Sequence, residues 1–243
     1  MATSCRNCPL RKLSLFAPMS EHEVDFMQDF KTGELQVDPG TTLMLEGSNS
    51  PQLYTVLEGM GLRYKTMASG DRQVLNIVLP GDFVGLQAGV MEEMQHSVEA
   101  TTAMTLCVFD RKSLWALFRD QPERAFDLTW IAAVEEHFLG EVLALIGHMS
   151  GIERIARAFV RLHDRGMALG LVEGAEMPLP YRQQDLADAL GLSLVHTNKT
   201  LKHLREERMV SWRNGTLRFL DYDKLCDIAG LDGARTPLTR PLI

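Results

Sequence analysis

Residues 183–201 read QQDLADALGLSLVHTNKTL, and this stretch decides how the C-terminal part of the chain folds. It predicts a helix, a three-residue turn that begins at Gly191, and a second helix capped by Ser193. The residues expected to be buried in the two helices recur at helical spacing, as expected of faces that pack against a core. They are Leu186, Ala187, Leu190, Thr197, Leu201 and Leu204.

The other side of the second helix carries polar groups that can meet base edges and phosphates in a DNA major groove. These residues are His196, Asn198, Lys199, Lys202 and His203. An ordinary helical hairpin with a solvated polar face would show the same pattern. The hairpin therefore needs support from the sequence that follows it.

That support comes from residues 209–220, MVSWRNGTLRFL, which predict two short strands around Asn214-Gly215. Asn-Gly is typical of a type I′ turn because both central residues of that turn need positive φ. Two helices followed by a hairpin make a winged helix-turn-helix. Arg213 and Arg218 on the wing are candidate contacts to a phosphate backbone, as are Arg182 and Gln183 at the start of the first helix.

The distribution of charge agrees with this placement. Residues 193–218 hold six Lys or Arg against two Glu, whereas the whole chain has a formal net charge of −7. Residues 1–150 sum to −9 and residues 151–243 to +2. We therefore expect a nucleic-acid surface in the C-terminal part only.

The remaining composition predicts a soluble, cytoplasmic protein with room for two small domains. No apolar run approaches the length of a membrane span, and the first six residues lack a signal-peptide core, so no membrane partner is expected. The sequence shows no nucleophile–base pair with supporting context, no phosphate-cradling glycine loop and no zincin motif. We expect no catalytic residues and no enzymatic activity.

Short apolar strands fill residues 33–110, where turn residues such as Asp38-Pro39-Gly40 and Pro80-Gly81-Asp82 interrupt them at regular intervals. This spacing predicts an antiparallel β domain, a sandwich or a barrel-like roll, that can enclose a ligand. Before it, residues 20–23 predict the capped start of a short helix.

A long helix is predicted from Pro122 to Met149, about 27 residues or on the order of 40 Å. Apolar residues alternate at spacings of three and four along it, which is typical of a coiled-coil dimer seam, although plain core gives the same spacing. The expected seam is Leu128, Ile131, Phe138, Val142, Leu145 and Met149, with Glu135 as its one polar break. Val134 could replace Glu135 there. If Glu135 faces its partner, two carboxylates would repel each other and weaken the dimer.

Three segments resemble successive turns of the β-roll in the Crp/Fnr superfamily of bacterial transcription regulators. They are residues 43–47, residues 53–59 and Leu79-Pro80-Gly81-Asp82-Phe83-Val84-Gly85. The long helix and the winged helix-turn-helix follow in the superfamily's order, so the resemblance covers roughly residues 5–223. It implies an α+β chain with an N-terminal arm (1–12), a β-roll sensor domain (13–118), a dimerisation helix (119–149), a DNA-binding domain (150–222) and a tail (223–243).

The resemblance also implies partners: a second copy of the chain, a palindromic double-stranded operator and RNA polymerase. The β-roll would influence the arrangement of the long helix. Each recognition helix would read one half-site. Base-reading positions would fall on Val195, Asn198 and Lys199, where the usual members have glutamate at the first and arginine at the last. Val195 cannot accept a hydrogen bond from cytosine but can touch a thymine methyl, so we expect a different half-site.

Cyclic-nucleotide-binding members of the superfamily hold the ribose with a glutamate just after a glycine, and the phosphate with an Arg-Ser pair. Here the glycine is Gly85, Leu86 stands at the glutamate position, and His96-Ser97 stands at the Arg-Ser position. Leucine cannot bond a hydroxyl, and a mostly neutral histidine is a poor phosphate clamp. We therefore expect this effector pocket to bind neither cyclic AMP nor cyclic GMP, as in the Fnr and FixK branch.

Fnr proteins bind an iron–sulfur cluster through three N-terminal cysteines and one on a late β-roll strand. Cys5 and Cys8 resemble the first pair and Cys107 the strand cysteine, whereas Ser14 occupies the third N-terminal position. Three interpretations stay open: a core cysteine with an unstructured or zinc-binding arm, a cluster with an unusual fourth ligand, and a Cys5–Cys8 disulfide switch. Cys226 is expected to be a buried structural residue.

Overall fold

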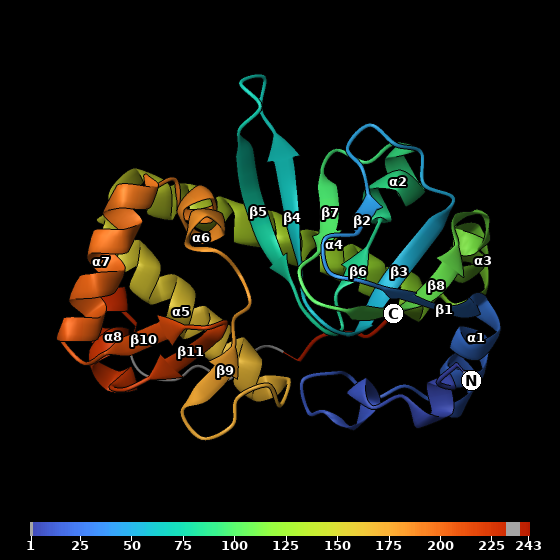
Figure 1. Cartoon of the computed structure of the whole chain (residues 1–243). Helices are drawn as coiled ribbons and strands as arrows, with labels where there is room; N and C mark the ends of the chain where they lie inside the picture. Colours follow the sequence, from blue (N-terminus) through green and yellow to red (C-terminus); the bar gives the residue numbers. More distant parts are fainter. Residues whose placement is uncertain (1, 232–238) are drawn as a thin grey trace. The chain divides into compact units, whose positions relative to one another are not determined.

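The computed structural model describes residues 2–231 and 239–243, which belong to two compact units (Figure 1). The N-terminal unit comprises residues up to 136 together with 239–243, and the C-terminal unit comprises residues 137–238. The predicted fold class is confirmed, because an antiparallel β-roll, a long helix and a winged helix-turn-helix follow one another along the chain.

The N-terminal unit contains two four-stranded sheets and short helices around them. The arm holds the 3-10 turns η1 (Cys5–Asn7) and η2 (Leu10–Lys12), and helix α1 (Glu21–Phe30) follows, capped by Ser20. The strands are β1 (Lys31–Val37), β2 (Thr42–Met44), β3 (Gln52–Glu58), β4 (Gly61–Thr66), β5 (Arg72–Val78), β6 (Phe83–Val84), β7 (Ser97–Ala100) and β8 (Met104–Asp110). Between and after them lie α2 (Leu86–Met91), η3 (Arg111–Ser113) and α3 (Leu114–Asp120). The sheet orders are β1-β8-β3-β6 and β2-β7-β4-β5, and every pairing is antiparallel.

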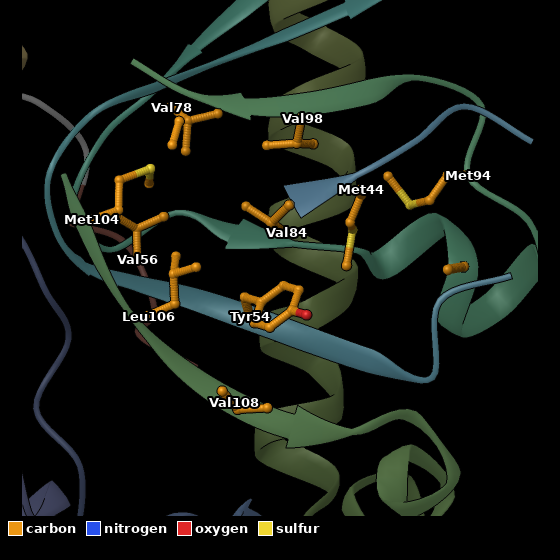
Figure 2. Packing of buried hydrophobic residues seen from close by; sticks show 12 residues of the cluster. Met44, Tyr54, Val56, Val78, Val84, Met94, Val98, Met104, Leu106 and Val108 are labelled. Atoms are coloured by element: carbon orange, nitrogen blue, oxygen red, sulfur yellow. The ribbon is translucent and has the colours of Figure 1, made fainter. Parts of the chain in front are cut away.

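Side chains fill the space between these two sheets. Figure 2 shows valine, leucine and methionine side chains from both sheets meeting in the middle of the roll. Val56, Val78 and Val98 are completely buried there. The packing is tight at the turn before α2, where Gly85 has φ +99° and a Cβ would lie 2.4 Å from Cε of Met44. Any residue but glycine would collide at that position.

A second apolar cluster lies between α1, the sheet β1-β8-β3-β6 and the start of the long helix α4 (Pro122–His148). Leu128 and Ile131 of α4 belong to it, packed with Phe30 and Phe109. Arg124, with only 7% of its side chain exposed, forms ion pairs with Glu23 of α1 (2.9 Å) and with Asp127 (2.8 Å). These contacts fix the first turns of α4 to the β-roll.

The C-terminal unit contains the rest of α4 and a small mixed domain. Its elements are α5 (Gly151–Ala168), β9 (Glu176–Pro178), α6 (Gln183–Leu190), α7 (Leu194–Glu206), β10 (Val210–Arg213), β11 (Thr216–Phe219) and α8 (Tyr222–Ala229). Helix α8, which lies in the segment expected to be a tail, packs along α5 through buried Leu225 and Cys226. In residues 2–231 and 239–243, no helix is both long and apolar enough to cross a membrane.

Candidate nucleic-acid interface

Helices α6 and α7 form the helix-turn-helix at the predicted residues. Helix α6 ends at Gly191, which has φ +63°, and the N–H of Leu192 donates to the carbonyl oxygen of Ala187 (3.0 Å). The hydroxyl of Ser193 then caps α7 by accepting a hydrogen bond from the N–H of His196 (3.2 Å). A left-handed glycine followed by a serine cap sets the angle between two helices within three residues.

The two sides of α7 differ as predicted. Thr197 and Leu204 are completely buried and Leu201 is nearly so, which fixes the helix against the core of the C-terminal unit. The expected base-reading residues Val195, Asn198 and Lys199 are all exposed, Val195 with 64% of its surface. Lys202 is exposed as well. Helix α7 therefore presents a polar face with one exposed valine.

The wing also forms where it was predicted. Strands β10 and β11 pair antiparallel, and their turn residues Asn214 (φ +51°) and Gly215 (φ +73°) both have positive φ. The sequence did not indicate a third strand, β9, which pairs with β11 through Met177. The indole N–H of Trp212 donates to the carbonyl oxygen of Leu179 (2.9 Å) and ties the wing to the segment before α6.

The predicted cationic contacts differ in whether they form ion pairs within the chain. Within the part of the chain that the structure describes, Lys199 and Arg213 are exposed and form no ion pair. Arg218 lies 3.5 Å from Glu176, and Lys202 lies 3.7 Å from Glu206. These are exposed pairs, which DNA phosphates can replace at little cost.

The other three expected contacts lie at the edges of the helix-turn-helix. Arg182 binds Asp185 through two nitrogens, at 2.6 and 3.1 Å, and so takes part in the cap of α6, while Gln183 is exposed. The imidazole of His196 lies against the first turn of α5. A Cβ on Gly151 would be only 2.2 Å from Nε2 of His196. His196 is nevertheless exposed, so its contact with DNA stays a prediction.

Two residues of the expected α4 seam, Leu128 and Ile131, pack within the chain itself. Leu128 and Ile131 are 1% and 5% exposed in the core of the N-terminal unit, and Phe138, Val142, Leu145 and Met149 are half-buried. The guanidinium of Arg161 on α5 lies 4.6 Å from the ring centre of Phe138. The exposed apolar residues lie on an adjacent face of α4: Leu139 (46% exposed), Leu143 (73%) and Ile146 (37%). This stripe keeps the three-and-four spacing but is rotated around the helix.

Glu135 is engaged by the β-roll of its own chain. Its carboxylate lies 3.0 Å from the guanidinium of Arg63 on β4, whose side chain is only 12% exposed. Arg63 also donates to the carbonyl oxygen of Phe83 (3.0 Å), and the amide of Asn76 on β5 donates to Glu135 (3.4 Å). This network ties the β4–β5 hairpin to α4. The carboxylate is thus neutralised by an arginine that no sequence pattern indicated.

The four residues of the expected effector pocket have different neighbours in the β-roll. Gly85 faces Met44, and Leu86 packs against the cluster between α1, β3 and α4. Ser97 is buried, and its hydroxyl accepts a hydrogen bond from the N–H of Glu46 (3.0 Å). Burial, together with the nearby cations Arg63 and Lys65, lowers the pKa of His96 to about 4, although Glu46 opposes the shift. His96 is therefore neutral at pH 7 and supplies no charge for a phosphate.

The three cysteines of the proposed metal site line one small cavity of the N-terminal unit, with a volume of about 40 Å³. Such a volume suits a few water molecules. Burial raises the pKa of the Cys107 thiol to about 11 and also raises that of Cys5, although the ammonium of Lys31 opposes both shifts. Ser14 is exposed, and in the described residues no three His, Cys, Asp or Glu side chains are placed to hold a metal ion. The cluster interpretation stays a prediction, because the three thiols share one cavity but are not placed as ligands of one ion.

Both halves of the chain match described domain families. Residues 34–121 match the cyclic nucleotide-binding domain, and residues 153–228 match the Crp-like helix-turn-helix domain. Among curated proteins, the chain is similar to the nitrogen fixation regulation protein FixK of Rhizobium meliloti, with 31% identity over 178 residues, 72% of this chain and 77% of that protein. It is also similar to the transcriptional activator protein FnrL of Cereibacter sphaeroides, with 25% identity over 94% of this chain and 92% of that protein.

Among solved structures, that of FixK2 from Bradyrhizobium japonicum resembles this one with a TM-score of 0.72. The match covers 83% of this chain and 98% of that chain at 23% sequence identity, so it concerns the fold alone.

Proposed function

Because the chain belongs to the Crp/Fnr family of DNA-binding transcription regulators, we propose that it acts as a homodimer on a two-fold symmetric operator. The observation that carries the proposal is the exposed face of α7, with Asn198 and Lys199 beside Val195 and with Arg213 on the wing. Amide and ammonium groups read base edges, whereas a wing arginine grips phosphate without regard to sequence. DNA binding would place the protein in the cytoplasm, where it would act on transcription by RNA polymerase.

The exposed stripe of α4 supports the homodimer. Leu139 and Leu143 are large exposed apolar side chains, and Ile146, beside Gly191 of its own chain, is 37% exposed; the same stripe on a second copy would cover them. Close by, a Cβ added to Gly140 or Gly147 would meet no atom of the described residues within 4 Å, so a second helix can approach closely there. A symmetric pair of α4 helices would provide two recognition helices for two half-sites.

We propose that each domain has the role expected from the sequence. The β-roll would carry the signal, α4 the dimer contact and residues 150–222 the DNA contact. The filled interior of the roll and the neutral His96 support an effector other than a cyclic nucleotide.

Selection of binding sites from random duplex DNA tests the proposal. We expect enrichment of a palindrome whose half-sites are about 10 base pairs apart, centre to centre. Lys199→Ala should lower affinity for the selected site by about 1–3 kcal/mol per half-site and relax the preference at one base pair. Lys224→Ala is the matched control, because Lys224 is an exposed lysine on α8 that pairs with Glu207 (3.1 Å). Unchanged affinity in Lys199→Ala, or a selected site without symmetry, would contradict the proposal.

A further inference from the structure

The last residues of the chain pack on the N-terminal unit, although the C-terminal unit precedes them in sequence. Arg240 forms a parallel β-bridge with Phe16. Its N–H donates to the carbonyl oxygen of Leu15 (2.8 Å), and its carbonyl oxygen accepts from the N–H of Ala17 (2.8 Å). Residues 240–243, here called the tail peptide, thus pair with residues 15–17 in the manner of an added strand.

Side chains specify this packing. The guanidinium of Arg240 lies 3.0 Å from the carboxylate of Asp82, and their side chains are only 14% and 5% exposed. Leu242 and Ile243 are each 5% exposed, and Ile243 belongs to the apolar cluster beneath α4. The hydroxyl of Thr55 on β3 donates to the main-chain oxygen of Ile243. A buried ion pair, strand-like hydrogen bonds and two apolar anchors are the elements of peptide recognition.

The tail peptide also forms part of the cysteine cavity. Leu242 and Ile243 line it together with Cys5, Cys8 and Cys107. At about 40 Å³, the cavity can hold little more than water while the tail peptide is in place. A larger group on Cys107, whose strand neighbour Thr55 bonds Ile243, would compete for this space with Leu242 and Ile243.

We propose that the N-terminal unit carries a groove for the chain's own tail peptide, and that docking of this peptide and alkylation of Cys107 exclude each other. The groove consists of residues 15–17, Asp82 and Thr55, and it recognises an arginine followed at short distance by two apolar residues.

The rate at which N-ethylmaleimide alkylates each cysteine tests the proposal in the full-length protein. Arg240→Gln removes the ion pair, and Ile243→Ser removes an apolar anchor but leaves Asp82 paired. In both variants, alkylation of Cys107 should accelerate about tenfold or more, because the tail peptide is undocked for a larger fraction of the time. Thr239→Ala is the matched control, since Thr239 is exposed and directly precedes the tail peptide. Its alkylation rates should equal those of the wild type.

Two further measurements separate undocking from unfolding. Cys226, 2% exposed on α8, should react equally slowly in all four proteins. Amide hydrogen exchange along β8 should stay slow in both tail variants. Fast exchange along β8 in both variants would overturn the proposal, because the tail peptide would then be an inseparable part of the core. Unchanged alkylation of Cys107 in both variants would overturn it as well.

A second experiment tests whether alkylation prevents docking of the tail peptide. The wild-type thiols are alkylated under mild denaturation, and the protein is then refolded. The amides of Arg240 and Ala17 should then exchange about tenfold faster than in the unmodified protein, because their hydrogen bonds depend on docking. Equal exchange rates before and after alkylation would show that the tail peptide and modified thiols coexist, and the proposal would be wrong.

Discussion

Replacement of Arg213 by alanine should weaken binding to every DNA sequence and flatten its salt dependence. Arg213 ends β10, is exposed and forms no ion pair in the described part of the chain, so its charge is available to a phosphate. Each phosphate that a protein neutralises contributes about 0.9 to the slope of log affinity against log salt. A homodimer has two wings, so the slope should fall in magnitude by about 1.8.

This slope gives a measurable difference. Raising the salt from about 50 to 200 mM, a fourfold change, should weaken wild-type binding about 12-fold more than binding by the variant. Fluorescence anisotropy with the selected operator and with a scrambled duplex, each at several salt concentrations, measures both slopes. Lys224→Ala serves again as the control and should keep the wild-type slope. An unchanged slope in Arg213→Ala would refute the phosphate contact, and a slope change on the operator alone would refute its sequence independence.

Three other outcomes are expected. Leu143→Asp should convert the dimer to a folded monomer in sedimentation experiments, whereas Met67→Asp, at another exposed apolar residue, should stay dimeric. Burial holds the pKa of His96 at about 4, below its ordinary 6.5. Between pH 7 and pH 5, His96 therefore binds a proton in the unfolded chain but stays neutral in the native one. The wild type should therefore lose about 2 kcal/mol more unfolding free energy than His96→Gln between pH 7 and pH 5, as urea titrations would show. Cyclic AMP or cyclic GMP at millimolar concentration should leave the melting temperature unchanged, and a saturable rise would contradict this.

The features that were predicted correctly from sequence are those with local causes. Gly191 and Ser193 determine the helix-turn-helix because a left-handed residue and a serine cap act within one turn of chain. Asn214-Gly215 determines the wing for the same reason, since few other dipeptides tolerate two positive φ values. The strand β9 had no such signal. It is three residues long and pairs with a strand about 40 positions later.

The expected seam of α4 shows that the spacing of apolar residues alone does not identify the dimer face. This helix has apolar residues on nearly every side, so more than one stripe follows the three-and-four spacing. Spacing alone cannot tell which stripe packs against the chain's own sheet and which meets a partner. The burial of Leu128 beside Phe109 shows which stripe packs against the chain's own sheet, and it depends on contacts far apart in sequence, while the exposure of Leu143 supports the proposed dimer face.

The same limit applies to Glu135, and it bears on how a signal would reach α4. Arg63 and Glu135 are 72 positions apart, so no local pattern could pair them. The family resemblance implies that the β-roll acts on the long helix. In this chain the polar connection between the two is built from Arg63, Asn76 and Glu135 themselves. Because Arg63 is mostly buried, breaking its pair with Glu135 would leave a charge without its partner, which is costly. We therefore expect a movement of β4 or β5 to be coupled to α4 through this ion pair.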